Sequence, residues 1–332
     1  MATAQVSRRP IYLVLDWDST LTTRDTMSLL GNVPKVRGRG MTPATAAYPA
    51  WDSFFSAYID DYKAHKAAHY PQSQEACHEE YSQWLQSLDV VELASSRRVS
   101  RSGFFTNSRS QHVRDVASDA LLSGQLALRT GWKDLLRLFS HDESMLPPTS
   151  SVSILSVNFS ATFIRSALRC AVPESGAAPR PEQNDILTMV NDMVIEANEI
   201  EGLDSSEGSS GRLYSRIRTA QHKLARITTL RQEHQAEQPI VVYVGDSATD
   251  YECLRAADIG VWICDCAERD YQKRFAEIFK PLGLDVFSPI AIERWESDHV
   301  PGKTCLWTPG LDRIVELLSD LGMRTSTQSN TK

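Results

Sequence analysis

Two aspartates, Asp16 and Asp18, follow directly after the apolar run "IYLVL" at residues 11–15. A short apolar run bounded by polar residues is typical of a buried strand, and aspartate is depleted in strand interiors. A strand that ends in two carboxylates is expected to present them to a ligand. Because side chains two residues apart point to the same side of an extended segment, both carboxylates are expected to serve one site.

Polar residues also follow two later apolar runs. Ser156 and Asn158 end "SVSILSVN", and Asp246 and Asp250 end "PIVVYVGDSATD". In an open α/β sheet, functional groups lie beyond the carboxyl ends of the strands. The alternative for any one of these residues is a helix N-cap, a position that favours aspartate and serine.

Four carboxylates in one crevice would repel one another and raise each other's pKa. A bound hard cation removes this conflict, and Mg²⁺ with oxygen ligands is the usual solution. The sequence therefore predicts a magnesium site formed by Asp16, Asp18, Asp246 and Asp250.

The elements that must position these groups alternate between strands and helices. Apolar runs predict strands at 11–15, within 151–158, within 239–250 and at 258–263, and amphipathic stretches predict helices between them. This alternation implies a parallel sheet with right-handed crossovers. The predicted fold class is therefore α/β, with a Rossmann-like core.

The segment 22–125 has a different character, because aromatic and aliphatic residues recur there at three- and four-residue spacing. This pattern predicts an inserted helical domain. The core is then expected to comprise 8–21 and 126–322. The polar end of the chain, 323–332, is expected to be disordered.

The composition restricts the choice of partners. The chain has 332 residues and a formal net charge of −7, which argues against nucleic acid or an anionic membrane as the main partner. Its six cysteines include no CxxC pair, so neither a zinc site nor a disulfide framework is expected. With no long apolar run and no signal-like start, we expect a cytoplasmic protein, with the nucleus as an alternative location.

These motifs carry a family resemblance. "DWDST" (16–20) resembles the DxDx[TV] signature of the haloacid dehalogenase-like (HAD) hydrolase superfamily, and "GDSATD" (245–250) resembles its GDxxxD signature. The step from an apolar strand to Ser156 resembles the second motif. Lys223 matches the superfamily's lysine, since no other lysine lies between the second and third motifs. The cationic alternatives nearby are Arg216, Arg218 and Arg226.

The resemblance implies a two-step phosphoryl transfer. Asp16 would attack phosphorus and form an aspartyl-phosphate, and Asp18 would act as general acid and then as general base. The residues expected to hold the phosphoryl group are Thr20, Ser156, Val157, Asn158 and Lys223. The expected cofactor is Mg²⁺, which would be held by the four aspartates of the predicted crevice.

The resemblance also implies that the inserted helices form a cap that selects a small phosphorylated metabolite. Trp51, Phe54, Phe55 and Tyr58 could line the substrate pocket, although aromatic residues at helical spacing are more often part of a core. The general pattern is that of the phosphoserine-phosphatase-like group. Its second motif usually reads Ser-Gly-Gly, whereas this chain has "SVN", which argues against phosphoserine itself.

The passages "LSVNFSATFIRSAL" and "IEANEIEG" look more like the HAD domain of plant thiamine monophosphate phosphatases and related fungal proteins. That resemblance implies thiamine monophosphate or a related ester as substrate, with Asn158 and Arg165 near the phosphate or the ring. The alternatives are a phosphoserine-phosphatase-like activity, a phosphomutase, and a catalytically idle HAD scaffold with a binding role.

Overall fold

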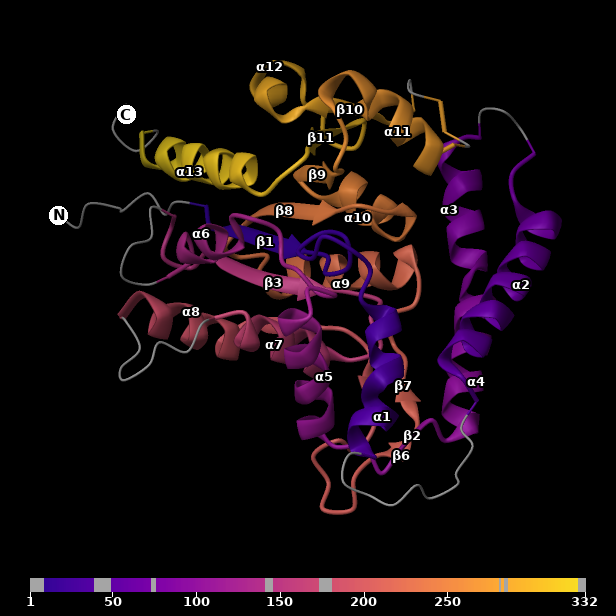
Figure 1. Cartoon of the computed structure of the whole chain (residues 1–332). Helices are drawn as coiled ribbons and strands as arrows, with labels where there is room; N and C mark the ends of the chain where they lie inside the picture. Colours follow the sequence, from indigo (N-terminus) through magenta and orange to yellow (C-terminus); the bar gives the residue numbers. More distant parts are fainter. Residues whose placement is uncertain are drawn as a thin grey trace.

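The computed structural model describes residues 9–38, 49–72, 76–140, 146–172, 181–280, 282–283 and 286–327. A seven-stranded sheet lies between two layers of helices, and further helices stand beside one end of its strands (Figure 1). The α-helices are α1 (Val33–Arg37), α2 (Trp51–His69), α3 (His78–Ser87), α4 (Asp89–Ser102), α5 (Ser110–Leu122), α6 (Trp132–Arg137), α7 (Ala161–Cys170), α8 (Pro181–Asp192), α9 (Ala220–Glu233), α10 (Tyr251–Ala256), α11 (Tyr271–Ile278), α12 (Trp295–Asp298) and α13 (Asp312–Thr327).

The large sheet has the order β10-β11-β9-β8-β1-β3-β4, and every neighbouring pair in it is parallel. This architecture confirms the predicted α/β fold class. Its strands are β1 (Ile11–Leu15), β3 (Ser151–Leu155), β4 (Val194–Glu196), β8 (Ile240–Gly245), β9 (Ile259–Ile263), β10 (Ser288–Ala291) and β11 (Thr304–Thr308). Strands β10 and β11 were not predicted from the sequence, because neither ends in a recognisable motif.

The central strand β1 is covered on both faces. Ile11, Leu13 and Leu15 belong to one apolar core, together with residues of α7 and α13. Val14 belongs to a second core with residues of α9 and α10. A parallel strand buried on both faces has no polar alternation, which is why β1 reads as an uninterrupted apolar run.

Among the described residues, no helix is long and apolar enough to cross a membrane.

Helices α2, α3 and α4 stand beside the carboxyl ends of the central strands (Figure 1). The inserted segment is not isolated from the rest of the chain. Its helix α5 packs against α7, and its short strand β2 (Phe105–Thr106) pairs with β6 (Ser210–Gly211). The domain boundaries at 22 and 125 therefore stay a prediction.

The C-terminal helix α13 continues to Thr327. The disorder expected for residues 323–332 stays a prediction. Residues 328–332 lie outside the described part of the chain.

Candidate active site

Asp16 and Asp246 lie side by side at the carboxyl edge of the sheet, because each directly follows one of two neighbouring strands, β1 and β8. The amide of Asp16 donates to the carbonyl oxygen of Val244 at 2.9 Å, which extends the ladder beyond β1. Asp16 is only 4% exposed. Asp250, just before α10, is completely buried.

Lys223, on α9, connects two of these acids. Its Nζ lies 2.9 Å from Asp16 Oδ1 and 2.7 Å from Asp250 Oδ1, and its side chain is 0% exposed. The hydroxyl of Tyr243 donates to the same oxygen of Asp250 at 2.6 Å. Lys223 is thus the cation of the cluster, and Tyr243 is a contributor that the sequence analysis missed, since it reads only as a strand residue.

The three arginines considered as alternatives to Lys223 bind elsewhere. Arg218 pairs with Asp89, Arg226 pairs with Glu196, and Arg216 lies over the ring of Tyr214.

The cluster is electrostatically coupled. Burial and the nearby Asp250 carboxylate raise the pKa of Asp16 to about 7, although Lys223 acts in the opposite direction. Burial by itself would lower the pKa of Lys223, but the carboxylates of Asp16 and Asp250 outweigh it and raise the pKa above its usual value. Burial, followed by the Asp250 and Asp16 carboxylates, also raises the pKa of Asp246. The site therefore holds more negative charge than one lysine balances.

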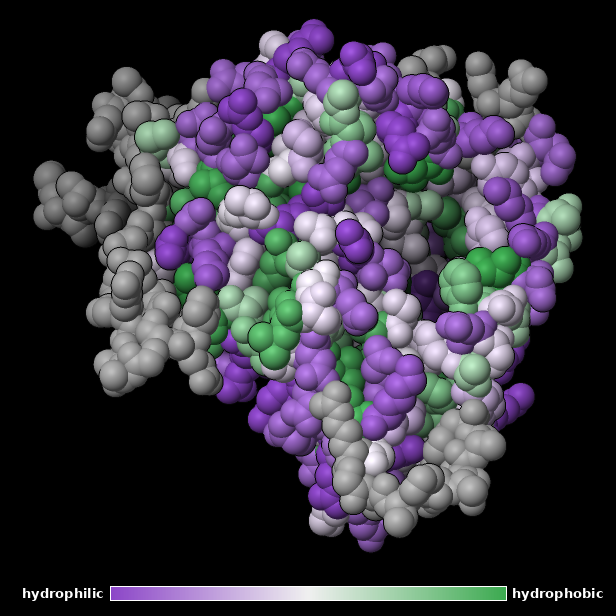
Figure 2. All heavy atoms as spheres, viewed as in Figure 1, coloured by the Kyte–Doolittle hydropathy of each residue, from purple (hydrophilic) through white to green (hydrophobic). Residues whose placement is uncertain are grey.

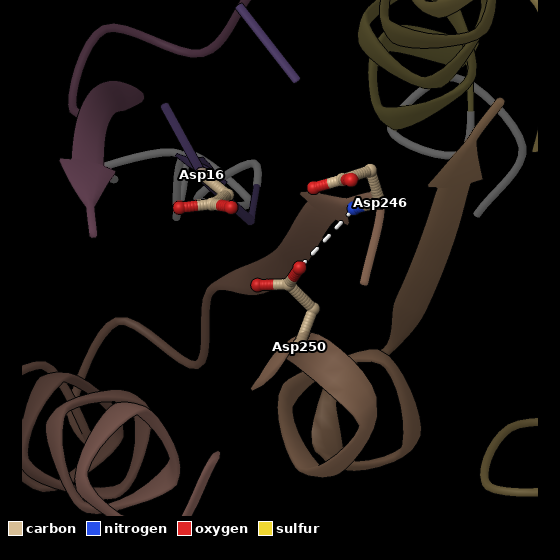
Figure 3. Close-up of side chains that lie close together, drawn as sticks. All are labelled: Asp16, Asp246 and Asp250. Atoms are coloured by element: carbon tan, nitrogen blue, oxygen red, sulfur yellow. Dashed lines mark hydrogen bonds between the residues drawn. The ribbon is translucent and has the colours of Figure 1, made fainter. Parts of the chain in front are cut away.

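A metal ion would fit this excess charge. One carboxylate oxygen from each of Asp16, Asp246 and Asp250 lies within 4.8 Å of the other two (Figure 3). Such a set of oxygen donors suits Mg²⁺. Asp246 is less engaged than Asp250, since its carboxylate accepts one hydrogen bond, from Thr20 at 3.3 Å.

Asp250 has a different position in the cluster from Asp246. Its Oδ2 accepts hydrogen bonds from the amide of Asp246 at 3.1 Å, drawn in Figure 3, and from the amide of Ser247 at 3.0 Å. Its Oδ1 faces Lys223 and Tyr243. Both carboxylate oxygens of Asp250 thus accept hydrogen bonds from the chain. Asp250 therefore stabilises the loop after β8 and orients Lys223.

The Asp18 carboxylate is held separately. It accepts hydrogen bonds from the amide and the hydroxyl of Thr26, at 2.7 and 2.5 Å, and from Asn158 Nδ2 at 2.9 Å. Burial and the Asp25 carboxylate raise the pKa of Asp18 to about 6. Within the described residues, its side chain is not part of the three-acid group that could hold a metal.

The second motif lies against the first. Asn158 donates to Asp18, and the Asn158 amide donates to Ser156 Oγ at 3.1 Å. Val157, between them, lines a cavity described below. Of the residues expected to hold phosphate, Thr20, Ser156 and Asn158 are buried next to the aspartates of the site, and Lys223 lies within the cluster.

Asn198 and Arg129 fasten the loops of the site. Asn198 Nδ2 donates to the carbonyl oxygens of Val157 and Ile217 at 2.9 and 2.8 Å. Arg129 donates to the carbonyl oxygens of Thr20 and Ser19 at 2.9 and 2.8 Å. The sequence analysis assigned no role to either residue. Asn198 stands in the "IEANEIEG" passage, whereas no motif signals Arg129.

The expectation that Arg165 lies near the phosphate or the ring is wrong. Its guanidinium donates to the carbonyl oxygens of Val190, Asn191 and Met193, with distances of 2.8 Å to the last two. These carbonyls lie at and just after the C-terminal end of α8, where unpaired acceptors attract a cation. Arg165 therefore joins α7 to α8.

A cavity of about 420 Å³ opens between α2, α4 and the loops at the end of the sheet. Figure 2 shows this face of the molecule hollowed between the helices on the right and the body of the protein. The four aromatic residues suggested as pocket-lining do line the cavity: Trp51, Phe54, Phe55 and Tyr58. The cavity also reaches Val157 of the second motif and Thr249 of the third, so it adjoins the aspartate cluster.

The similarity of this chain to known proteins is limited. No protein-family model matches it. A CTO1 family protein of Schizosaccharomyces pombe is 23% identical over 303 residues, which is 89% of this chain and 94% of that protein.

Two solved structures are similar at low sequence identity. A phospho-aspartyl intermediate analogue of phosphoserine phosphatase has a TM-score of 0.45 and 13% identity, with 93% of this chain and 99% of that chain covered. A probable phosphoserine phosphatase from Vibrio cholerae has a TM-score of 0.46 and 16% identity, with 97% and 67% covered.

Proposed function

We propose that this chain is a Mg²⁺-dependent HAD-type phosphatase that hydrolyses a small phosphorylated metabolite. The observation that carries the proposal is the pairing of two aspartates with different surroundings. Asp16 is buried with Lys223 at 2.9 Å and two further acids nearby. Asp18, two residues on, is held by Thr26 and Asn158.

In the first step, a carboxylate oxygen of Asp16 bonds to phosphorus as the bond to the leaving oxygen breaks. Asp18 in its protonated form gives its proton to the leaving alkoxide. Since burial raises the pKa of Asp18 to about 6, a useful fraction is protonated near neutral pH. Lys223 offsets the negative charge that gathers on Asp16 and the phosphoryl oxygens.

In the second step, Asp18, now ionised, accepts a proton from a water molecule that attacks phosphorus. The bond between phosphorus and Asp16 breaks, phosphate leaves, and both aspartates return to their starting forms. One hard displacement is thereby divided into two easier ones.

The proposed metal ligands are the carboxylates of Asp16 and Asp246 and the main-chain carbonyl of Asp18. Asp250, whose oxygens already accept hydrogen bonds from the chain, would support the site from behind. When bound, Mg²⁺ would neutralise phosphoryl charge and allow an anionic substrate to approach an acidic site.

The first candidate substrate is thiamine monophosphate. The proposal rests on the resemblance of the second-motif region and on the aromatic cavity beside Val157, which suits a ring system. A cytoplasmic location stays a prediction.

The test measures phosphate release from a panel that contains thiamine monophosphate, phosphoserine and a generic aryl phosphate, with and without Mg²⁺. We expect EDTA to abolish release and Asp16→Asn to lower kcat at least about 10³-fold, because the nucleophile is lost. The matched control is Asp134→Asn, which removes an exposed carboxylate on α6 that pairs only locally with Arg137. It should leave kcat unchanged.

The panel also separates the alternatives. A phosphomutase would need a bisphosphate activator, and a phosphoserine-type enzyme would prefer phosphoserine. No release from any ester, with folded protein and Mg²⁺ present, would reject the phosphatase proposal in favour of the idle scaffold.

A further inference from the structure

The wall of the cavity beside Val157 is acidic. Within the described residues, three carboxylates line it, those of Asp25, Asp52 and Glu92. One guanidinium, that of Arg218, lines it as well. Arg218 is already engaged by Asp89 outside that lining, through contacts of 2.7 and 3.1 Å. The cavity lining thus carries three carboxylates against one guanidinium, which Asp89 already engages.

Glu92, on α4, is the carboxylate that most needs a partner. Its Oε1 accepts a hydrogen bond from the hydroxyl of Tyr58 at 2.8 Å, but among the described residues it forms no ion pair. Burial and the Asp89 carboxylate raise the pKa of Glu92 to about 7, although the Tyr58 hydrogen bond and the Arg218 guanidinium act in the opposite direction. A cationic group placed in the cavity would restore its ionised form.

Aromatic rings surround the same space. Trp51, Phe54 and Tyr58 line the cavity, and so does Phe55, whose side chain is 63% exposed. The faces of aromatic rings carry negative potential and attract cations, quaternary ammonium groups in particular. An exposed phenylalanine at the cavity is also free to cover a bound ligand.

We propose that this cavity binds the alcohol part of the substrate as a cation, held between aromatic rings and Glu92, so that the enzyme selects phosphate monoesters with a positively charged nitrogen. The inference rests on the proposed function, because the phosphoryl end must lie at Asp16 for the alcohol part to enter the cavity next to Val157 and Thr249. Glu92 is then a specificity-determining residue.

The test compares phosphocholine with 3,3-dimethylbutyl phosphate, which has the same shape but no charge. We expect wild-type kcat/KM to favour phosphocholine, and Glu92→Gln to lower that preference about tenfold, since a charged partner in a desolvated cavity is worth about this much. The amide can still accept the Tyr58 hydrogen bond, and the neutral ester should react at nearly the wild-type rate.

The matched control is Asp52→Asn. Asp52 lines the same cavity but is exposed, so solvent screens its charge and the preference should change less than about twofold. Equal preference for the two esters in the wild type, or a preference that Glu92→Gln leaves intact, would overturn the inference while the phosphatase activity stands.

A binding measurement keeps the two proposals separable. Choline and 3,3-dimethylbutan-1-ol are titrated into the wild-type protein by calorimetry, where no turnover is needed. We expect choline to bind more tightly and Glu92→Gln to remove the difference. If no ester of either experiment is hydrolysed, the proposed function fails, and this titration still decides whether the cavity selects a cation.

Discussion

The aspartate cluster and the cavity wall hold their carboxylates differently: Asp16 and Asp250 are buried, whereas Glu92 is partly buried and Asp25 and Asp52 are exposed. In the cluster, Asp16 and Asp250 share Lys223, and Asp250 receives further hydrogen bonds from Tyr243 and two amides. In the cavity wall, Glu92 has one hydrogen bond and, among the described residues, no ion pair, although the Arg218 guanidinium is near enough to lower its pKa.

The difference indicates which kind of ligand each region is suited to bind. A buried charge is costly unless it is paired and hydrogen-bonded. The cluster contains one cation, Lys223, and lacks the further countercharge that a metal would supply. In the cavity wall, Glu92 has no ion-pair partner among the described residues, and the proposed cationic substrate would supply one.

The largest expected effect is on catalysis by the cluster. Asp18→Asn should lower kcat for an alkyl phosphate by about 10²- to 10⁴-fold, because the leaving alkoxide loses its proton donor. The loss should be smaller for 4-nitrophenyl phosphate, whose leaving group needs no proton. Phosphate release from both esters is measured, and an equal loss for the two would contradict the general-acid role.

The next effect is on the stability of the cluster. Lys223→Met leaves Asp16 and Asp250 buried without their cation, so the free energy of unfolding should fall by about 3–5 kcal/mol. Urea unfolding followed by circular dichroism measures it. Lys273→Met, at an exposed position of α11, is the matched control and should shift stability by less than about 0.5 kcal/mol.

If Lys223→Met were as stable as the control, the cluster would not be a charge-balanced network. The contrast with the cavity wall would then disappear.

A smaller effect is expected at the cavity wall, in the pH dependence of stability. The folded pKa of Glu92 is raised to about 7, so between about pH 4.5 and 7 the unfolded chain loses a proton that the folded chain keeps. Stability from this group is complete below pH 4.5 and is lost as the pH rises through 7. Glu92→Gln should remove about 1–3 kcal/mol of that decline.

The measurement is urea unfolding of the wild type and of Glu92→Gln at pH 5 and pH 8. Asp52→Asn serves again as the exposed control. Parallel pH dependence in the wild type and Glu92→Gln would mean that folding does not raise the pKa of Glu92.

The smallest effect concerns a residue that belongs to neither region. Arg165→Ala should cost about 1 kcal/mol of stability, since it frees carbonyls at the end of α8. It should leave KM for every ester unchanged. A rise in KM with kcat constant would show that Arg165 contributes to substrate binding.

The local features of the site could be predicted from the sequence. The strands that precede Asp16, Ser156 and Asp246 are apolar runs, and the parallel arrangement followed from their alternation with helices. Lys223 could be chosen because it is the single lysine in its interval.

Other features had no local signal. Arg129 and Asn198 act through main-chain carbonyls that are far away in the sequence, and such contacts leave no spacing pattern. Arg165 lies in the second-motif passage, but its guanidinium binds a carbonyl oxygen just after the end of α8. The carboxylates of Asp16 and Asp18 are only two residues apart, yet Asp18 turns toward Asn158, beside a left-handed Ser19.

The sequence by itself determined which residues stand at the ends of strands, because burial and strand direction follow from the order of apolar and polar side chains. Only the tertiary structure decided which charges meet. Whether a carboxylate is balanced, like Asp250, or left open, like Glu92, depends on distances between segments that pack together from distant parts of the chain. Those distances set the cost of each buried charge, and hence what the site is prepared to bind.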